Sequence, residues 1–267
     1  MTPGGVVYLA TPGATENYLG NWLLDTQGTS LSEPVTLEPA PGVASPILNG
    51  NNGSPFGCQT VTCDGTVFAI GYASEAPVYA VVQGVTFEGA ILGAMANEGV
   101  LTVMNCTFSD NAATAGAGIY NDTGLLYVSG STFVDNTAMD GGAIYDAEGL
   151  AYVTTSTFYS NTANVGGAIK TDYGPVIVWA STFSANTANM YGNTIDDQPN
   201  GIVQAAADIF DGSCNQASGT EWDDEGYNVS SDATCLNAGQ GDVDHNASLT
   251  SLLGVLSNNG GPTETML

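Results

Sequence analysis

The chain has 267 residues, of which 43% are hydrophobic and 10% are charged, and 35 of them are glycine. This composition excludes a disordered protein and is typical of a β protein with many turns. The formal net charge is −26, and Lys170 is the only lysine or arginine. Nucleic acids and anionic membranes are bound through Lys and Arg, so both are excluded as partners. An excess of carboxylates also favours a salty or calcium-rich medium.

Residues 1–99 predict a succession of short strands that is less regular than the sequence after it. The runs at 6–9, 35–37, 46–50, 67–70 and 78–82 are rich in Val, Ile, Leu and aromatic residues, and turn residues separate them. Trp22 lies in a longer excursion, which we expect to cover an open end of the stack where a sheet edge would otherwise be unpaired.

Residues 100–195 contain one repeat of 25 residues in four copies. The aromatic position of the repeat is filled by Phe108, Phe133, Phe158 and Phe183. Three residues after each Phe comes an asparagine, at Asn111, Asn136, Asn161 and Asn186. Eleven residues after the first three Phe come Ile119, Ile144 and Ile169, and the fourth copy slips by one residue to Ile195. A fixed period of this length indicates stacked structural units.

Each copy contains three short β runs, seen at 142–145, 150–153 and 156–158, with Asn, Gly, Asp or Ser between them. Three strands and three turns make one triangular coil, and identical coils stack with parallel strands in register. The sequence therefore predicts an all-β fold: a right-handed parallel β-helix with about 25 residues and three short strands per coil. The Phe column would lie inside, and the Asn column would form a ladder at a turn, where Asn tolerates positive φ. A leucine-rich repeat has a similar period but needs a different spacing of Leu and Asn.

One β-helix domain is expected to span residues 1–267. It would comprise irregular N-terminal coils (1–99), regular repeats (100–195), and C-terminal coils with a loop-rich closing segment (196–267). No run approaches 18 apolar residues, so we expect no insertion into a membrane. No secretory signal is visible after Met1, so the chain is either cytoplasmic or a piece of a longer secreted protein, and we favour the second.

The five cysteines predict two local disulfides. Cys58 and Cys63 are five residues apart, and Cys214 and Cys235 bracket a loop rich in Gly, Ser and Asp. Both pairs would indicate an oxidising compartment. Cys106 is left over, at a position where the other copies have Ser, and is interpreted as a buried free thiol.

Several carboxylates could in principle carry chemistry. A hydrolase needs two carboxylates at a suitable separation, and candidates are Asp196–Asp197, Asp223–Asp224, and Asp242–Asp244 with His245. Solvated turn carboxylates are the favoured interpretation of all three. Asp242 and Asp244 are also candidate oxygen ligands for Ca²⁺. Lys170 fills a position that has Tyr in the neighbouring copies, so it is interpreted as a surface substitution and not as a catalytic base.

The repeat at 126–138 followed by Gly141-Gly-Ala-Ile144 resembles those of bacterial surface and secreted right-handed β-helix proteins, among them families with polymorphic outer-membrane-protein-like repeats. The tail at 226–235, 252–256 and 259–265 is similar to the closing module of large anchored surface β-helix proteins. The resemblance implies the β-helix fold and a role as an adhesin or surface protein. The same fold is also found in pectate lyases and polygalacturonase-like hydrolases, but such lyases need an Arg and this chain has none.

We therefore predict a non-catalytic β-solenoid that acts outside the cell or at the cell surface as an adhesin, stalk or scaffold. The alternative is a polysaccharide-active β-helix enzyme, similar to a glycoside hydrolase, that uses paired Asp. No cofactor is required, and Ca²⁺ is the one candidate. Expected partners are glycans, cell-surface or matrix components, or copies of the chain itself. The Thr residues before each Phe (107, 132, 157 and 182) suggest an ice-binding ladder, but no second Thr file accompanies them.

Overall fold

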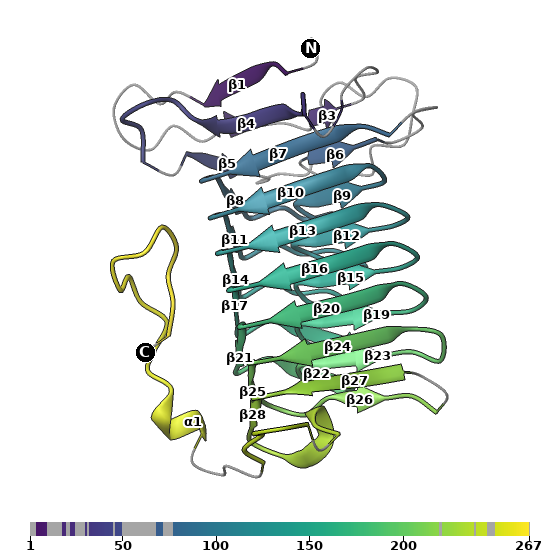
Figure 1. Cartoon of the computed structure of the whole chain (residues 1–267). Helices are drawn as coiled ribbons and strands as arrows, with labels where there is room; N and C mark the ends of the chain where they lie inside the picture. The colour runs from purple at the N-terminus through teal and green to yellow at the C-terminus, as the bar shows by residue number, and fades with distance from the viewer. Residues whose placement is uncertain are drawn as a thin grey trace.

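The computed structural model describes residues 4–9, 18–19, 22–24, 30, 32–44, 46–49, 68–71, 77–218, 221–237, 239–244 and 249–266. In these residues the chain winds into a parallel β-helix, in which three stacks of short strands share one axis (Figure 1). All named strand pairs are parallel, and successive strands of one coil pass from the first sheet to the second and then to the third. The predicted fold class is confirmed.

The three sheets are named A, B and C. Sheet A contains β1 (Val6–Leu9), β4 (Val35–Pro39), β7 (Tyr79–Gln83), β10 (Val100–Met104), β13 (Leu125–Ser129), β16 (Leu150–Thr154), β20 (Pro175–Trp179), β24 (Ile202–Ala206) and β27 (Glu221–Gly226). Sheet B contains β2 (Tyr18–Leu19), β5 (Ile47–Asn49), β8 (Thr86–Glu88), β11 (Thr107–Ser109), β14 (Thr132–Val134), β17 (Thr157–Tyr159), β21 (Thr182–Ser184), β25 (Ile209–Asp211) and β28 (Val229–Ser230).

Sheet C contains β3 (Trp22–Leu24), β6 (Phe68–Ile70), β9 (Met95–Asn97), β12 (Ile119–Asn121), β15 (Ile144–Asp146), β19 (Ile169–Thr171), β23 (Ile195–Asp197) and β26 (Asn215–Gln216). Two further strands, β18 (Thr162–Val165) and β22 (Thr187–Tyr191), pair at the corner between sheets B and C. A 3-10 helix, η1 (Ala233–Cys235), and one short helix, α1 (Leu249–Leu252), follow the last coils.

The core is a set of columns because equivalent residues of neighbouring coils pair directly. Six phenylalanine rings, from Phe87 to Phe210, are fully buried and stack with neighbouring centroids 4.6 to 5.3 Å apart. Such spacing is that of adjacent strands, so each ring covers the face of the next. The predicted inward Phe column is therefore the central feature of the core.

The Asn column forms a buried ladder beside the rings. Asn136 Nδ2 donates to Asn161 Oδ1 at 2.9 Å and to the carbonyl of Phe108 at 2.9 Å, and the same pattern repeats in the neighbouring coils. The positive φ lies one residue earlier than expected, at Asp110, Asp135, Ser160 and Ala185. The Asn side chain thus forms hydrogen bonds with buried backbone groups of the turn, while the residue before it adopts the positive φ.

The C-terminal segment returns along the stack after the last coil. α1 and a bridge between Ser257 and Thr265 lie beside sheet B (Figure 1). Thr263 Oγ1 donates to the Gly130 carbonyl at 2.9 Å, and Thr132 Oγ1 donates to the Glu264 carbonyl at 2.6 Å. The segment therefore covers part of the Thr file on sheet B, where Thr132 is fully buried. Among the described residues, no helix is long and apolar enough to cross a membrane.

Candidate binding face

The outward side of sheet A carries no charge over six consecutive strands. From β7 to β24, residues alternate between buried and solvent-facing, and the first, third and fifth positions of each strand face outward. We name these positions the uncharged face. Its members are Tyr79, Val81, Gln83, Val100, Thr102, Met104, Leu125, Tyr127, Ser129, Leu150, Tyr152, Thr154, Pro175, Ile177, Trp179, Ile202, Gln204 and Ala206.

Large apolar side chains dominate the uncharged face. Trp179 is 52% exposed and Tyr127 is 38% exposed. The rings of Tyr127 and Tyr152, on adjacent strands, stack with centroids 5.1 Å apart and planes within 8°. Each of the two rings therefore covers one face of the other. Exposed apolar patches of this kind mark interaction sites.

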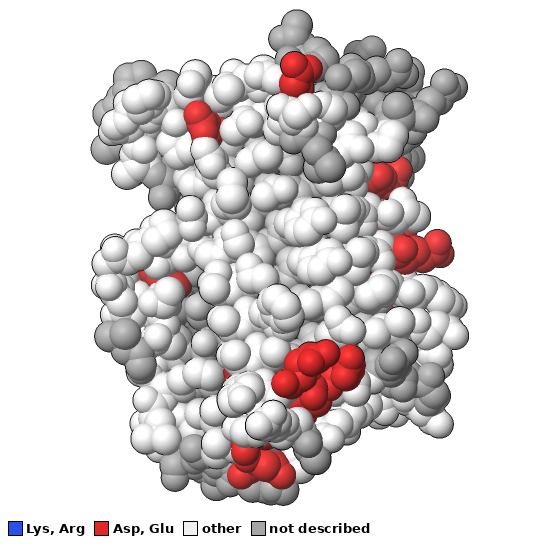
Figure 2. Space-filling model, viewed as in Figure 1, with Lys and Arg blue, Asp and Glu red and all other residues white. Residues whose placement is uncertain are grey.

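Carboxylates border the uncharged face at both ends. Glu38 lies on β4 and accepts a hydrogen bond from Gln83 Nε2. At the other end, β27 brings Asp223 and Glu225 into sheet A. Figure 2 shows the front of the molecule almost free of acidic side chains between these ends, with a dense acidic cluster over β27. In a chain with a net charge of −26, this absence of charge distinguishes the surface.

Lys170 lies on sheet C and is largely buried, which corrects the interpretation of an exposed surface substitution. Its Nζ is 3.0 Å from Asp172 Oδ1, 3.3 Å from Asp140 Oδ1 and 4.8 Å from the centre of the Tyr145 ring. The Tyr145 hydroxyl donates to Asp172 Oδ2. Asp196 pairs with Lys170 in register on the next strand. Two carboxylates and an aromatic ring thus surround the Lys170 side chain, which serves as an ion-pair partner on sheet C.

The first predicted carboxylate pair, Asp196–Asp197, ends strand β23 and is buried. The pKa of Asp196 is raised, because burial outweighs the opposing effects of the neighbours. These are hydrogen bonds from Gln198 Nε2 and Asn215 Nδ2 and the charge of Lys170. The side chain of Asp197 lies against Gly201, at the turn into β24. The two neighbours in sequence thus occupy different environments, as adjacent residues of a strand do.

The structure brings Asp224 together with Asp242 from the other two predicted pairs. Asp224 accepts hydrogen bonds from the backbone of Gly226 and Asn237 at 3.0 and 2.8 Å, and Asp242 Oδ1 accepts from the Asn228 backbone at 2.8 Å. Burial, and then the neighbouring Asp224, raises the pKa of Asp242. Asp244 is exposed, and His245 lies outside the described residues.

No group of three or more metal-binding side chains (His, Cys, Asp or Glu) is present within the described ranges. The Asp224–Asp242 neighbourhood therefore offers two carboxylates as oxygen ligands. Calcium binding at Asp242 and Asp244 stays a prediction.

Two buried carboxylates with raised pKa values were not among the sequence candidates. Burial raises the pKa of Asp146 to about 7 and that of Asp208 to about 8. Asp146 accepts from Asn121 Nδ2, and its Oδ2 has no hydrogen-bond partner. Asp208 accepts from the backbone N–H groups of Ser181 and Ala206 at 2.7 and 3.1 Å. The sequence could have indicated both residues, because each stands at a repeat position that has Asn, Ser or Thr in the neighbouring coils.

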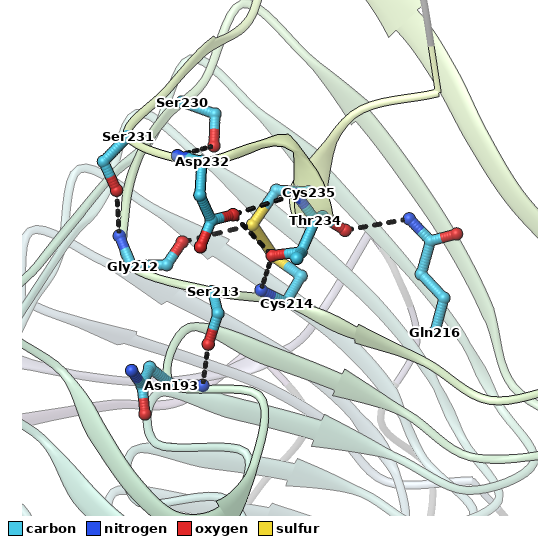
Figure 3. Close-up of a disulfide and its surroundings, with 10 residues drawn as sticks. All are labelled: Asn193, Gly212, Ser213, Cys214, Gln216, Ser230, Ser231, Asp232, Thr234 and Cys235. Carbon is cyan, nitrogen blue, oxygen red and sulfur yellow. Dashed lines mark hydrogen bonds between the residues drawn. A yellow bond between two sulfur atoms is a disulfide. The ribbon is translucent and has the colours of Figure 1, made fainter. Parts of the chain in front are cut away.

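A disulfide joins Cys214 to Cys235 between the last two coils (Figure 3). Around it, Thr234 ties η1 to the residue before β26, because its Oγ1 accepts from the Cys214 N–H at 2.8 Å and donates to Asp232 Oδ1 at 2.6 Å. Cys106 is a buried free thiol whose pKa is raised by burial to about 12. Cys58 and Cys63 lie outside the described residues.

Residues 130–147 match the Chlamydia polymorphic membrane protein repeat. They run from the turn before β14 to the end of β15 and one residue beyond, so the match falls on part of one regular coil. Neither the curated proteins nor the solved structures contain a match to the chain. The chain is a parallel β-helix protein with a repeat like that of the polymorphic membrane proteins.

Proposed function

We propose that this β-helix with a polymorphic-membrane-protein-like repeat is a non-catalytic module at the cell surface or outside the cell. It acts as an adhesin, stalk or scaffold, and the uncharged face is its binding surface. The observation that carries the proposal is the absence of charge over six strands of a chain with net charge −26. Charged residues are depleted at the centres of protein interfaces, whereas Tyr and Trp are enriched there.

Two other observations support the location. The matched repeat is named for membrane proteins of Chlamydia. The Cys214–Cys235 disulfide is stable in an oxidising compartment. The solenoid itself suits a stalk or scaffold, because each coil contacts only its neighbours and the stack can be extended without limit on its size.

Binding to a panel of immobilised neutral glycans and matrix proteins tests the function. We expect the wild-type protein to bind at least one member, and Tyr152→Glu to abolish that binding by placing a charge at the centre of the uncharged face. Tyr191→Glu is the matched control, because Tyr191 is 54% exposed on β22, at the corner between sheets B and C. Equal binding by all three proteins would contradict the proposal.

A second candidate function is a polysaccharide-active enzyme. One observation favours it: Asp196, with its raised pKa, shares sheet C with the Lys170–Asp172–Tyr145 group. A carboxylic acid with a raised pKa near a second carboxylate, here Asp172, is the arrangement of many glycosidases. Release of reducing ends from the same glycans by wild-type protein, lost in Asp196→Asn and retained in Tyr152→Glu, would favour the enzyme over the binding module.

A further inference from the structure

We propose that the uncharged face binds the same face of a second copy of this chain, with the two β-helix axes antiparallel. The inference rests on the proposal that this face is the binding surface, and it names the partner. Two copies would pack sheet A against sheet A, as two sheets do in a β-sandwich. The arrangement has two-fold symmetry, so each patch serves as its own partner.

Charge selects this face for contact between copies. Wherever carboxylates of two copies meet they repel, and in the described part of the chain the cation that could pair with them, Lys170, is already held by Asp140 and Asp172. The outward side of sheet C carries Lys170 and Asp196, and the C-terminal segment covers part of sheet B. Over the six strands of the uncharged face, no carboxylate of one copy faces a carboxylate of the other.

Repulsion between carboxylates also decides the relative orientation of the two copies. With parallel axes, the acidic strand β27 of one copy would face β27 of the other, and Asp223 would oppose Asp223. With antiparallel axes, β27 faces β4 of the partner, so Asp223 opposes a threonine (Thr36) and Glu38 lies opposite the end of β27. The rotation axis then passes midway along the six uncharged strands, between β13 and β16. The stacked pair of Tyr127 and Tyr152 lies at this centre, where interface residues contribute most.

The size of the face predicts a weak dimer. Six strands about 4.8 Å apart and five residues of about 3.3 Å each cover roughly 500 Å² per copy. The pair would bury about 1,000 Å² in total, which is the lower limit for a specific interface. We therefore expect association in the micromolar range, strengthened by NaCl because salt screens the repulsion between the two acidic bodies.

Ring orientation argues for a protein partner over a sugar. The Tyr127 and Tyr152 rings each cover one face of the other, whereas a sugar stacks on an open aromatic face. The β-branched side chains of the uncharged face, such as Val81, Thr102 and Ile177, instead suit packing against an opposing sheet.

Sedimentation equilibrium of the whole chain over a wide concentration range tests the proposal. The wild type should form dimers whose dissociation constant falls as NaCl is raised. Tyr152→Glu and Trp179→Glu should each weaken dimerisation, the central Tyr152→Glu by at least about 30-fold, and Tyr191→Glu should not. Far-ultraviolet circular dichroism checks that each variant is folded. Two variants of the uncharged face are used, so that the test remains if one of them does not fold.

Cysteine cross-linking tests the orientation. Antiparallel packing places β10 opposite the partner's β20. A mixture of Thr102→Cys and Ile177→Cys proteins should therefore form disulfide-linked dimers under mild oxidation, whereas each variant alone should not. If each variant formed disulfide-linked dimers with itself, and the mixture contained no dimer that joins the two variants, the antiparallel arrangement would be overturned.

A wild type that stays monomeric at high concentration and high salt would overturn the second copy as the partner. If Tyr152→Glu then still lost glycan or matrix binding, the uncharged face would serve another partner and the proposed function would stand. If neither self-association nor that binding depended on Tyr152, both proposals would fail together.

Discussion

The regular coils and the C-terminal coils of this β-helix are held together by different chemistry. In the regular coils, each residue contacts its equivalent 25 residues away, through stacked rings and amide-to-amide hydrogen bonds. In the C-terminal coils the spacing changes: Asp208 contacts Ser181, 27 residues away, and Asn228, 20 residues away. A disulfide and the 3-10 helix η1 then close the stack. Repetition extends a solenoid, whereas ending it needs groups that occur once.

The largest effect is expected from the ring column. Phe158→Ala removes a fully buried ring with a neighbour on both sides and should lower the unfolding free energy by about 3–5 kcal/mol. Phe210→Ala removes the ring at the C-terminal end of the column, which stacks on Phe183, so it should cost less. Urea denaturation of both variants measures the difference. A larger loss of unfolding free energy in Phe210→Ala than in Phe158→Ala would show that the ring column stabilises the C-terminal coils more than the regular coils.

Removing the disulfide should destabilise the C-terminal coils. Cys214→Ser with Cys235→Ser opens a loop of 21 residues and should cost about 3 kcal/mol. Cys106→Ser is the control in the regular coils. It should cost little, because Ser131 in the next coil donates to the Ser129 carbonyl as Cys106 Sγ donates to that of Met104. Thermal melts of the wild type, the double variant and Cys106→Ser measure these effects. A double variant with the melting temperature of the wild type would show that the disulfide does not stabilise the C-terminal coils.

Buried carboxylates make stability fall as pH rises. The pKa of Asp146 is raised to about 7 and that of Asp208 to about 8, so the folded state holds protons that the unfolded state loses near pH 4. Their contribution is therefore complete below about pH 4 and is lost as pH rises through 7 to 8. Melting temperature should increase on going from pH 8.5 to pH 5.5. A decrease over the same interval would contradict these protonation states.

Asp146→Asn should stabilise the protein by about 1–3 kcal/mol at pH 8 and leave it unchanged at pH 5. Asn121 donates to the carbonyl three residues later, Gly124, at 3.0 Å. The introduced amide would donate in the same way to the carbonyl of Gly149, whereas the ionised carboxylate of Asp146 cannot. Asp208→Asn is the matched control from the C-terminal coils, where both carboxylate oxygens accept backbone hydrogen bonds. It should not stabilise, and equal gains would show that position in the column is irrelevant.

The smallest effect is expected from calcium. Raising ionic strength shortens the screening length from about 30 Å at 0.01 M to about 8 Å at physiological salt, so NaCl should raise the melting temperature. We propose that Ca²⁺ adds to this by binding carboxylates of the C-terminal coils, where Asp224 and Asp242 are neighbours. Asp242→Asn should remove only the added effect. Identical melting curves in CaCl₂ and NaCl at equal ionic strength would rule out bound calcium.

The regular coils, the strands of the N-terminal coils and the Cys214–Cys235 disulfide were predictable from sequence, whereas the uncharged face and the return of the C-terminal segment were not. Four copies of Thr-Phe and Asn fix the register, because a slip by one residue would turn Phe158 out of the core. The uncharged face was missed, although its signal is present: the run Leu150-Ala-Tyr-Val153 is apolar on both sides of the strand, where an ordinary surface strand alternates. The contact of Thr263 with Gly130 joins residues 133 apart, and no local pattern encodes such a distance.

We propose that the uncharged face exists for binding and not for folding. Apolar outward side chains could instead stabilise sheet A through contacts between neighbouring strands. Measuring unfolding free energy and self-association together in Tyr152→Glu separates the two. We expect the loss of the ring stack with Tyr127 to lower the unfolding free energy by no more than about 1.5 kcal/mol, while self-association is lost. A variant that loses several kcal/mol of stability and still associates like the wild type would contradict it.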